Sequence, residues 1–334
     1  MSTCERKKII YSGIQPTGCI TIGNYIGAIK NWLELKNDYN CIFSIVNMHS
    51  MTVRQDPKVL RENTLGFLAQ YIACGLDPKE NVLYIQSHVK NHAQLTWILN
   101  CFSYIGEMNR MTQFKEKSAK NTDNLNMGLM TYPILMAADI LLYNTDLVPV
   151  GADQKQHLEF TRDVAIRFNN LYGNVFTIPE PYIPKEGARI NSLQDPTSKM
   201  SKSDTNINGY ISIIDSPDVI LSKFRKAITD SDDRIIVSPD KAGISNLLTI
   251  YSSCSGESVE SAVARFLGKG YGFFKNAVGE SVVDILSPVR EEYLRLIKDK
   301  GYLMQIAREG AYKADMYSER VMAKVEKKVG FVVR

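Results

Sequence analysis

Short apolar runs of strand length recur along the first half of the chain. They occupy residues 9–11, 41–46, 82–85 and 147–150, and each is bounded by polar or turn-forming residues. Amphipathic stretches of helical length lie between them, and a last strand-like run covers residues 210–214. Because strands that alternate with helices are typical of parallel sheets, this pattern predicts an α/β fold.

Three of the intervening stretches repeat apolar residues every three or four positions, which places those residues on one face of a helix. A fourth stretch, between residues 89 and 146, is also mainly helical and has the position of an insertion between two halves of the sheet. The positions expected on the buried faces are Ile26, Ile29 and Leu33, then Leu65, Leu68 and Ile72, then Leu158, Thr161, Ala165 and Phe168.

The second half of the chain has a different character, because strand-like runs largely stop there. A domain boundary is expected near residues 205–210, followed by an all-helical region. Small residues in the last helix, over residues 302–328, suit close packing on another element. The expected helix starts are near Pro217, Gly243, Ser258 and Ser287. The small residues of the last helix are Ala307, Ala311, Ala314, Ser318, Val321 and Val325.

Composition bounds the class of protein without identifying it. Hydrophobic residues make up 44% and charged residues 23% of 334 residues, and the formal charge of +4 is too small to indicate a nucleic-acid partner. The six cysteines form no C-x-x-C pair, so we interpret them as reduced residues of a cytoplasmic protein without a zinc site. The polar N-terminus is unlike a signal peptide, and the most apolar stretch, residues 133–143, is too short for a membrane span.

Three loops carry residue types that bind nucleotides. Residues 15–18 and 21–24 lie between a strand and a helix, where free N–H groups and glycines favour phosphate, although ordinary turns also contain glycine. Residues 199–203, Lys-Met-Ser-Lys-Ser, can surround a polyphosphate or form an exposed basic loop. Residues 151–154 follow the fourth strand, where Asp153 can accept from ribose hydroxyls or cap the next helix.

Residues 199–203 are identical to the KMSKS signature of the class I aminoacyl-tRNA synthetases, and residues 21–24 stand where that family has its HIGH signature. The chain resembles the bacterial tryptophanyl branch of this family over nearly its whole length. Thr21 and Asn24 replace both histidines of HIGH, so they can hydrogen-bond phosphate oxygens but carry no charge. The longer matching words lie at residues 12–16, 23–28, 111–115, 136–141, 150–154 and 268–272.

The resemblance implies a Rossmann-type catalytic domain over residues 1–205, whose helical insertion at about 89–146 carries a homodimer interface. It also implies an all-helical anticodon-binding domain over residues 206–300 and a C-terminal helix, 301–334, that packs back on the catalytic domain. The implied reaction is activation of L-tryptophan by ATP, with Mg²⁺ bound mainly through the phosphates. The amino acid then passes to the 2′-hydroxyl of the terminal adenosine of tRNA(Trp).

The resemblance also assigns roles to individual residues. Catalytic roles fall to Lys199, Ser201, Lys202, Thr21, Asn24 and Lys115. ATP contacts are expected from Gln15, Pro16, Thr17, Gly23, Asn24, Gly151, Ala152, Asp153, Ile190, Lys199, Met200, Ser201, Lys202 and Ser203. Tryptophan contacts are expected from Asp139, Met136, Tyr132, Gln154, Tyr11, Ser12, Gln15 and His49.

Asp139 is the most informative single position, because it interrupts the apolar run at residues 134–142. A buried carboxylate is costly unless it accepts hydrogen bonds, and the alternative is a place on the one polar face of a helix. The resemblance implies that the indole N–H of tryptophan donates to it. Since indole offers only a donor, a substrate without that N–H would leave the charge unpaired and be rejected.

Other signals are given less weight. His88 and His92 are four residues apart, as in a metal-binding helix, but a third ligand is missing, so no metal site is predicted. Gly268, Gly270 and Gly272 are interpreted as a turn between helices, and the acids at residues 230–233 as a solvated turn. The rival functions are a tyrosyl-tRNA synthetase, a small-molecule adenylyltransferase and a synthetase-like regulator without charging activity.

Overall fold

A five-stranded parallel sheet forms the centre of the computed structural model, and its strand order is β3-β2-β1-β4-β5. The order reverses between β1 and β4, where doubly wound sheets bind ligands. The predicted α/β class is therefore confirmed. The structure describes residues 6–115, 125–151, 154–182, 189–202 and 204–332. The strands are β1 (Ile9–Ile14), β2 (Asn40–Ile45), β3 (Val82–Ile85), β4 (Leu147–Pro149) and β5 (Glu180–Tyr182).

Four of the five strand-like runs lie in this sheet, but the fifth does not. Of residues 210–214, Ser212 alone makes a β-bridge, with Thr21, and the expected strand is absent there. Ile211 and Ser212 are buried nonetheless, because they pack beneath the first helix of the chain, whose Ile22 N–H donates to the Ile211 carbonyl. The run thus joins the loop at residues 21–24 to the second half of the protein.

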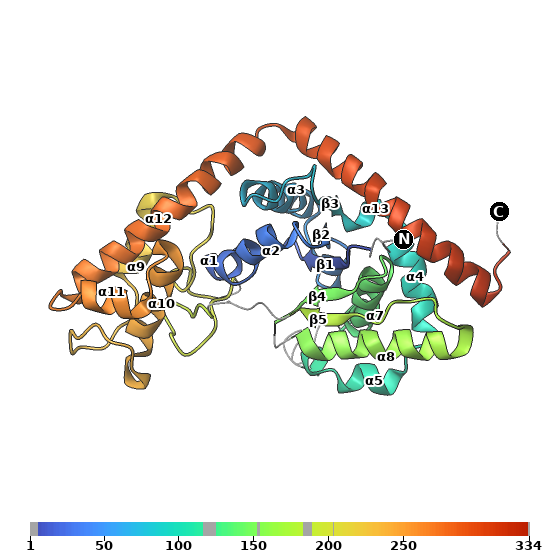
Figure 1. Ribbon diagram of the computed structural model, residues 1–334, viewed down its shortest axis with the longest axis horizontal. Coiled ribbons are helices and arrows are strands. Elements are labelled where there is room, and N and C mark those ends of the chain that lie inside the picture. The colour runs from blue at the N-terminus through green and yellow to red at the C-terminus, as the bar shows by residue number, and fades with distance from the viewer. Residues whose placement is uncertain (1–5, 116–124, 152–153, 183–188, 203, 333–334) are drawn as a thin grey trace, which may run out of the picture.

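Helices cover both faces of the sheet (Figure 1). The first helix, residues 22–35, contains a π-helical segment, and α3 starts at Pro57 because the Asp56 side chain accepts from two backbone N–H groups. The described residues of the insertion between β3 and β4 are mainly helical, as predicted. Helices of this half are α1 (Ile22–Asn24), η1 (Tyr25–Ile29), α2 (Lys30–Leu35), η2 (His49–Thr52), α3 (Pro57–Ala73), η3 (Gln86–His88), α4 (Asn91–Asn100), α5 (Ile105–Arg110), α7 (Met127–Leu141) and α8 (Lys155–Tyr172).

The C-terminal region is helical and lies to one side of the sheet, except for its last helix (Figure 1). The helix expected to begin near Ser287 begins at Tyr271 instead, so Pro288 lies inside α12 rather than in its first turn. No helix in the described ranges combines the length and apolar character needed to cross a bilayer. The elements are α9 (Pro217–Arg225), η6 (Pro239–Lys241), α10 (Ala242–Ser255), α11 (Val259–Arg265), α12 (Tyr271–Leu296) and α13 (Lys300–Val329).

Helix α13 returns to the first half of the chain and packs against β3, α3 and α4 (Figure 1). Its small residues are buried, and Gly310 lies against the backbone of β3. A Cβ atom at Gly310 would stand 1.7 Å from the Leu83 carbonyl oxygen, which cannot move without disturbing the sheet. The glycine therefore sets how closely the last helix approaches the sheet.

Replacing Gly310 with alanine is expected to destabilise the fold, although alanine is normally favoured in helices by about 1 kcal/mol. The overlap with Leu83 should lower the free energy of unfolding by about 1–3 kcal/mol in urea denaturation. Gly272→Ala is the matched control, because that helical glycine has open space around its Cβ position. Equal stability of the two variants would contradict close packing of α13 on β3.

Candidate active site

A cavity of about 350 Å³ opens where β1 and β4 end, at the edge where parallel sheets bind ligands. Every residue predicted to contact tryptophan lines it, although these residues come from distant parts of the chain. The eight are Tyr11, Ser12, Gln15, His49, Tyr132, Met136, Asp139 and Gln154. Lining residues that the sequence did not indicate are Gly13, Val46, Thr52, Gln113, Ile140, Val148, Pro149 and Val150.

Asp139 lies on α7 at the wall of this cavity and is 2% exposed. One carboxylate oxygen, Oδ2, lies 2.8 Å from His49 Nε2. The other, Oδ1, lies 2.6 Å from His92 Nδ1 and accepts from Gln86 Nε2 at 2.7 Å. The polar-face alternative is therefore wrong, and three side chains solvate a carboxylate within an apolar helix.

These donors decide the charge of Asp139. Burial raises the pKa of the carboxyl group, but His92 and His49 lower it by more, so that the pKa stands at about 2. The group is consequently a carboxylate at neutral pH. The cavity thus presents a fixed negative acceptor within a mainly apolar wall.

Further polar groups line the same cavity. The Tyr132 hydroxyl lies 3.0 Å from His157 Nε2, and Gln15 Nε2 donates to the His49 carbonyl at 3.3 Å. Met136 lies one turn before Asp139 on α7. The polar groups around an apolar slot suit a ligand that has both a flat apolar part and charged ends.

The two loops predicted to bind phosphate, at residues 15–24 and 199–202, meet beside this cavity. A Cβ at Gly23 would lie 3.5 Å from Ile190 and 3.8 Å from Met200, and the Met200 N–H donates to the Ile190 carbonyl. Thr21 is buried, and its hydroxyl accepts the Asn24 N–H at 3.2 Å as a helix cap, whereas Asn24 is exposed. The Thr21 side chain is thus occupied by the helix start.

Lys202 connects the two loops directly. Its ammonium donates to the Gln15 carbonyl at 3.2 Å and lies 5.2 Å from the centre of the Phe67 ring. Gly18 permits this approach, because its φ is +68° and a Cβ there would stand 3.1 Å from Lys202. Burial lowers the pKa of Lys202 to about 8. A half-buried ammonium beside a glycine loop is placed to meet an anion.

Other predicted positions are more open. Lys115, Gly151, Lys199 and Ser201 are exposed, and Pro16 is buried whereas Thr17 is half-buried beside the same glycine loop. Ala152, Asp153 and Ser203 lie outside the described residues, so the ribose and helix-cap alternatives for Asp153 both stay open.

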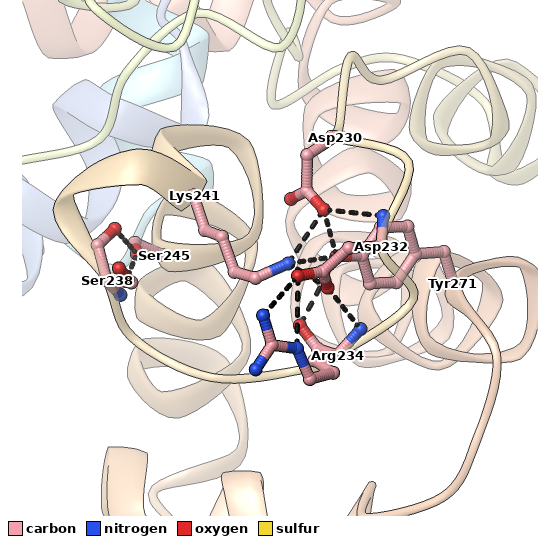
Figure 2. Close-up of polar contacts among 7 residues, drawn as sticks. All are labelled: Asp230, Asp232, Arg234, Ser238, Lys241, Ser245 and Tyr271. Carbon is pink, nitrogen blue, oxygen red and sulfur yellow. Dashed lines mark hydrogen bonds and ion pairs between the residues drawn. The ribbon is translucent and has the colours of Figure 1, made fainter.

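The acids at residues 230–233 do bind a cation, which is a lysine of the chain itself. The Lys241 ammonium, 5% exposed, donates to Asp230 at 2.7 Å, to Asp232, and to the Tyr271 hydroxyl at 2.9 Å (Figure 2). Tyr271 belongs to the glycine-rich segment that begins α12. This cluster therefore joins the loop before α10 to α12, while residues 231–234 of the turn stay exposed, as expected.

Among the described residues there is no group of three or more metal-binding side chains. His88 and His92 do not act together, because His92 bonds to Asp139 and to two tyrosines. In the sequence, the spacing of four between His88 and His92 is the only feature that draws attention to His92, and that spacing suggests metal binding rather than a bond to Asp139.

Comparison with known proteins gives a consistent family. The model of "tRNA synthetases class I (W and Y)" matches residues 3–287. The tryptophan–tRNA ligase of Clostridium tetani (strain Massachusetts / E88) is 52% identical over 329 residues, which are 98% of this chain and 97% of the relative.

Solved structures agree with this match. The tryptophanyl-tRNA synthetase of Mycoplasma pneumoniae superposes with a TM-score of 0.88 at 34% identity, covering 98% of this chain and 99% of that one. That of Campylobacter jejuni, complexed with ADP and tryptophan, gives 0.85 at 34% identity, covering 97% and 100%. A tyrosyl-tRNA synthetase from Aeropyrum pernix, at 18% identity, gives 0.68 over 91% and 90% and shares the fold alone.

Proposed function

This chain belongs to the class I tRNA synthetases for tryptophan and tyrosine, and from that premise we propose which residues carry its reaction. The reaction is ATP-dependent activation of L-tryptophan to tryptophanyl-adenylate, followed by transfer to tRNA(Trp). The cavity at the ends of β1 and β4 holds the amino acid, and the loops at residues 15–24 and 199–202 hold ATP.

The observation that carries this assignment is the charged, buried Asp139 in the cavity wall. Its carboxylate accepts the indole N–H, which has no acceptor role of its own. Tyr132 and Gln154 face the ammonium of the substrate, and Tyr11, Ser12, Gln15, Met136 and His49 complete the wall around the ring and carboxylate.

In the first step a carboxylate oxygen of tryptophan attacks the α-phosphorus of ATP. An oxygen–phosphorus bond forms as the bond from the α-phosphorus to the bridging oxygen breaks, and pyrophosphate leaves with the electron pair. Lys202 and Lys199 stabilise the charge that moves onto pyrophosphate, with Lys115 and Ser201 in support. Asn24 donates to phosphate, and Gly151 lies on the nucleotide side.

Mg²⁺ fits this site only as a companion of ATP. The described residues offer no cluster of carboxylate or imidazole ligands that could hold the ion alone. Bound together with ATP, the ion would supply further charge neutralisation.

The helical region after about residue 205 is proposed to bind the anticodon, and residues 301–334 to tie it back to the catalytic part. The second step gives the amino acid to the 2′-hydroxyl of the terminal adenosine. We place the reaction in the cytoplasm, since the five cysteines of the described residues are free thiols, as a reducing compartment requires.

A homodimer through the insertion at residues 89–146 is proposed from its exposed apolar side chains. Trp97, Ile105 and Met127 are 70%, 71% and 69% exposed, and Tyr104 and Leu125 add to them. Such exposure on one segment is typical of a protein interface. Sedimentation at micromolar concentration should show a dimer, and Trp97→Glu a monomer. A monomeric wild-type protein would disprove this interface.

The function is tested by ATP–pyrophosphate exchange with tryptophan, tyrosine and phenylalanine in parallel, followed by charging of a tRNA(Trp) transcript. Exchange with tryptophan should exceed that with phenylalanine by at least about 10⁴-fold, as in other sites built to bond a polar group. Exchange with tyrosine would overturn the pocket assignment. ATP–pyrophosphate exchange without charging of the tRNA would favour a small-molecule adenylyltransferase. The absence of exchange with all three amino acids would favour a synthetase-like regulator.

A further inference from the structure

A buried chain of hydrogen bonds runs from Asp139 away from the cavity. His92, on α4, is fully buried and lies with Nδ1 2.6 Å from Asp139 Oδ1. On its far side, His92 Nε2 lies 2.9 Å from the hydroxyls of both Tyr84 and Tyr143. The Tyr143 hydroxyl donates to that of Tyr84 at 2.7 Å. Neither His92 nor Tyr84 nor Tyr143 lines the cavity.

The proton positions in this chain follow from what each group can do. A carboxylate only accepts, so His92 Nδ1 carries a proton and donates to Asp139. On the far side of the ring, His92 Nε2 lies within hydrogen-bond distance of both tyrosine hydroxyls, and Tyr143 also donates to Tyr84. These contacts hold the ring with its Nδ1–H directed at Asp139.

The two oxygens of Asp139 therefore have different surroundings. Oδ1 accepts from His92 and from Gln86, both on the interior side. Among the residues that the structure describes, Oδ2 has one partner, His49, which itself lines the cavity. The interior donors fix the carboxylate plane and leave accepting capacity on the oxygen nearest the ligand.

We propose that His92, held by Tyr84 and Tyr143, is a positioning residue for substrate recognition. It keeps Asp139 oriented and ionised, with Oδ2 available to the N–H of the bound amino acid. His92 touches no substrate and acts through Asp139. This inference rests on the proposed function, because it assumes a ligand that donates to Asp139.

The charges around Asp139 support a role in keeping it ionised. The groups facing it are His92 from α4, His49 from η2, Gln86 from η3, Tyr84 from β3, and Tyr11 and Tyr143. Burial raises its pKa, and the histidines hold the pKa down at about 2. Without His92 the pKa of Asp139 must rise. A protonated carboxyl group no longer demands a donor from the substrate.

The test compares wild type, His92→Leu and His92→Asn, since the asparagine N–H can replace Nδ1–H. Exchange is measured from about pH 5 to 8 with tryptophan and with β-(benzothiophen-3-yl)alanine, in which sulfur replaces the N–H. His92→Leu should raise KM for tryptophan by about 10- to 100-fold and leave KM for ATP unchanged. In this variant kcat/KM should also fall at the acid end of the pH range, and the preference for tryptophan over the sulfur analogue should become smaller. His92→Asn should largely restore the wild-type pH profile and the wild-type preference.

Tyr84→Phe supplies a second variant if His92→Leu does not fold, because it removes only the hydroxyl that contacts His92 Nε2. It should change KM for tryptophan, the pH profile and the preference for tryptophan in the same directions as His92→Leu, but by smaller factors. His88→Leu is the control, because His88 lies in η3, just before α4, and forms no hydrogen bond with Asp139. Wild-type exchange with tryptophan, together with unchanged pH profile and N–H preference in the variants, would overturn the positioning role alone. No wild-type exchange would overturn the proposed function and this inference with it.

Discussion

Replacing Lys202 with alanine is expected to lower tryptophan-dependent ATP–pyrophosphate exchange by about 100- to 1,000-fold, as loss of one buried charge-stabilising donor does elsewhere. The ammonium lies between the Gln15 carbonyl and the Phe67 ring, and Gly18 packs on the methylene stem, so the charge is already partly desolvated where the phosphates are proposed to bind. Its charge therefore acts without strong screening by water. Most of the loss should appear in kcat, because the charge on pyrophosphate grows as the bond breaks.

The same lysine predicts a dependence on pH. Because burial lowers the pKa of Lys202 to about 8, the charge is present below that pH and is lost above it. At saturating tryptophan, kcat/KM for ATP should fall as pH rises through about 8 in the wild type. Lys202→Arg keeps its charge at all these values and should lack this alkaline limb, even if its rate is lower.

Lys79→Ala provides the control for Lys202, because Lys79 is exposed in the turn before β3. It should exchange like the wild type. Similar losses in both variants would mean that general charge, rather than the position of Lys202, governs the rate. A full rate in Lys202→Ala would remove this lysine from the mechanism.

The strands show which part of this fold local sequence can predict. β1 to β4 each contain a short apolar run, since strands of a parallel sheet are buried on both faces. β5, Glu180–Tyr182, has three residues and a central proline, so no such run marks it. Residues 210–214 look like a strand because they are buried between layers, but burial does not specify a pairing partner.

The starts of helices are also only partly predictable from local sequence. A helix start is expected near Ser287, and the proline that follows it, Pro288, is a residue type that the first turn of a helix favours. The tertiary contacts of Tyr271 with Asp230 and Lys241 instead anchor the start of α12 16 residues earlier, at a segment whose glycines resemble a turn. Long-range contacts of this kind leave no local periodic signal.

Some residues of the candidate site can be predicted from the sequence, and others cannot. Asp139 is conspicuous in the sequence because a carboxylate interrupts an apolar run. His92 is not, because its partners Tyr84, Asp139 and Tyr143 come from other elements and nothing in the spacing predicts that they meet. Residues that line the cavity are predicted through the matching words, whereas the residues that hold them can be identified only from the fold.

Asp139→Asn is expected to lower kcat/KM for tryptophan by about 100- to 1,000-fold and to reduce the preference for tryptophan over phenylalanine by about 100-fold. The wild-type carboxylate accepts from His49, His92 and Gln86. An asparagine has one accepting oxygen and adds an NH₂ group that faces one of these donors. The oxygen that remains cannot serve both the interior donors and the substrate.

Selectivity separates recognition from simple damage to the cavity. With Asp139 charged, a phenylalanine ring leaves the carboxylate without a donor from the ligand, which is costly in a buried site. Asparagine carries no charge, so this penalty on phenylalanine shrinks while the bond to tryptophan also weakens. Asp163→Asn, on the exposed face of α8, is the matched control and should change neither value. Equal losses for both substrates would show that Asp139 shapes the cavity without reading the indole N–H, and that the selectivity for tryptophan comes from the apolar wall.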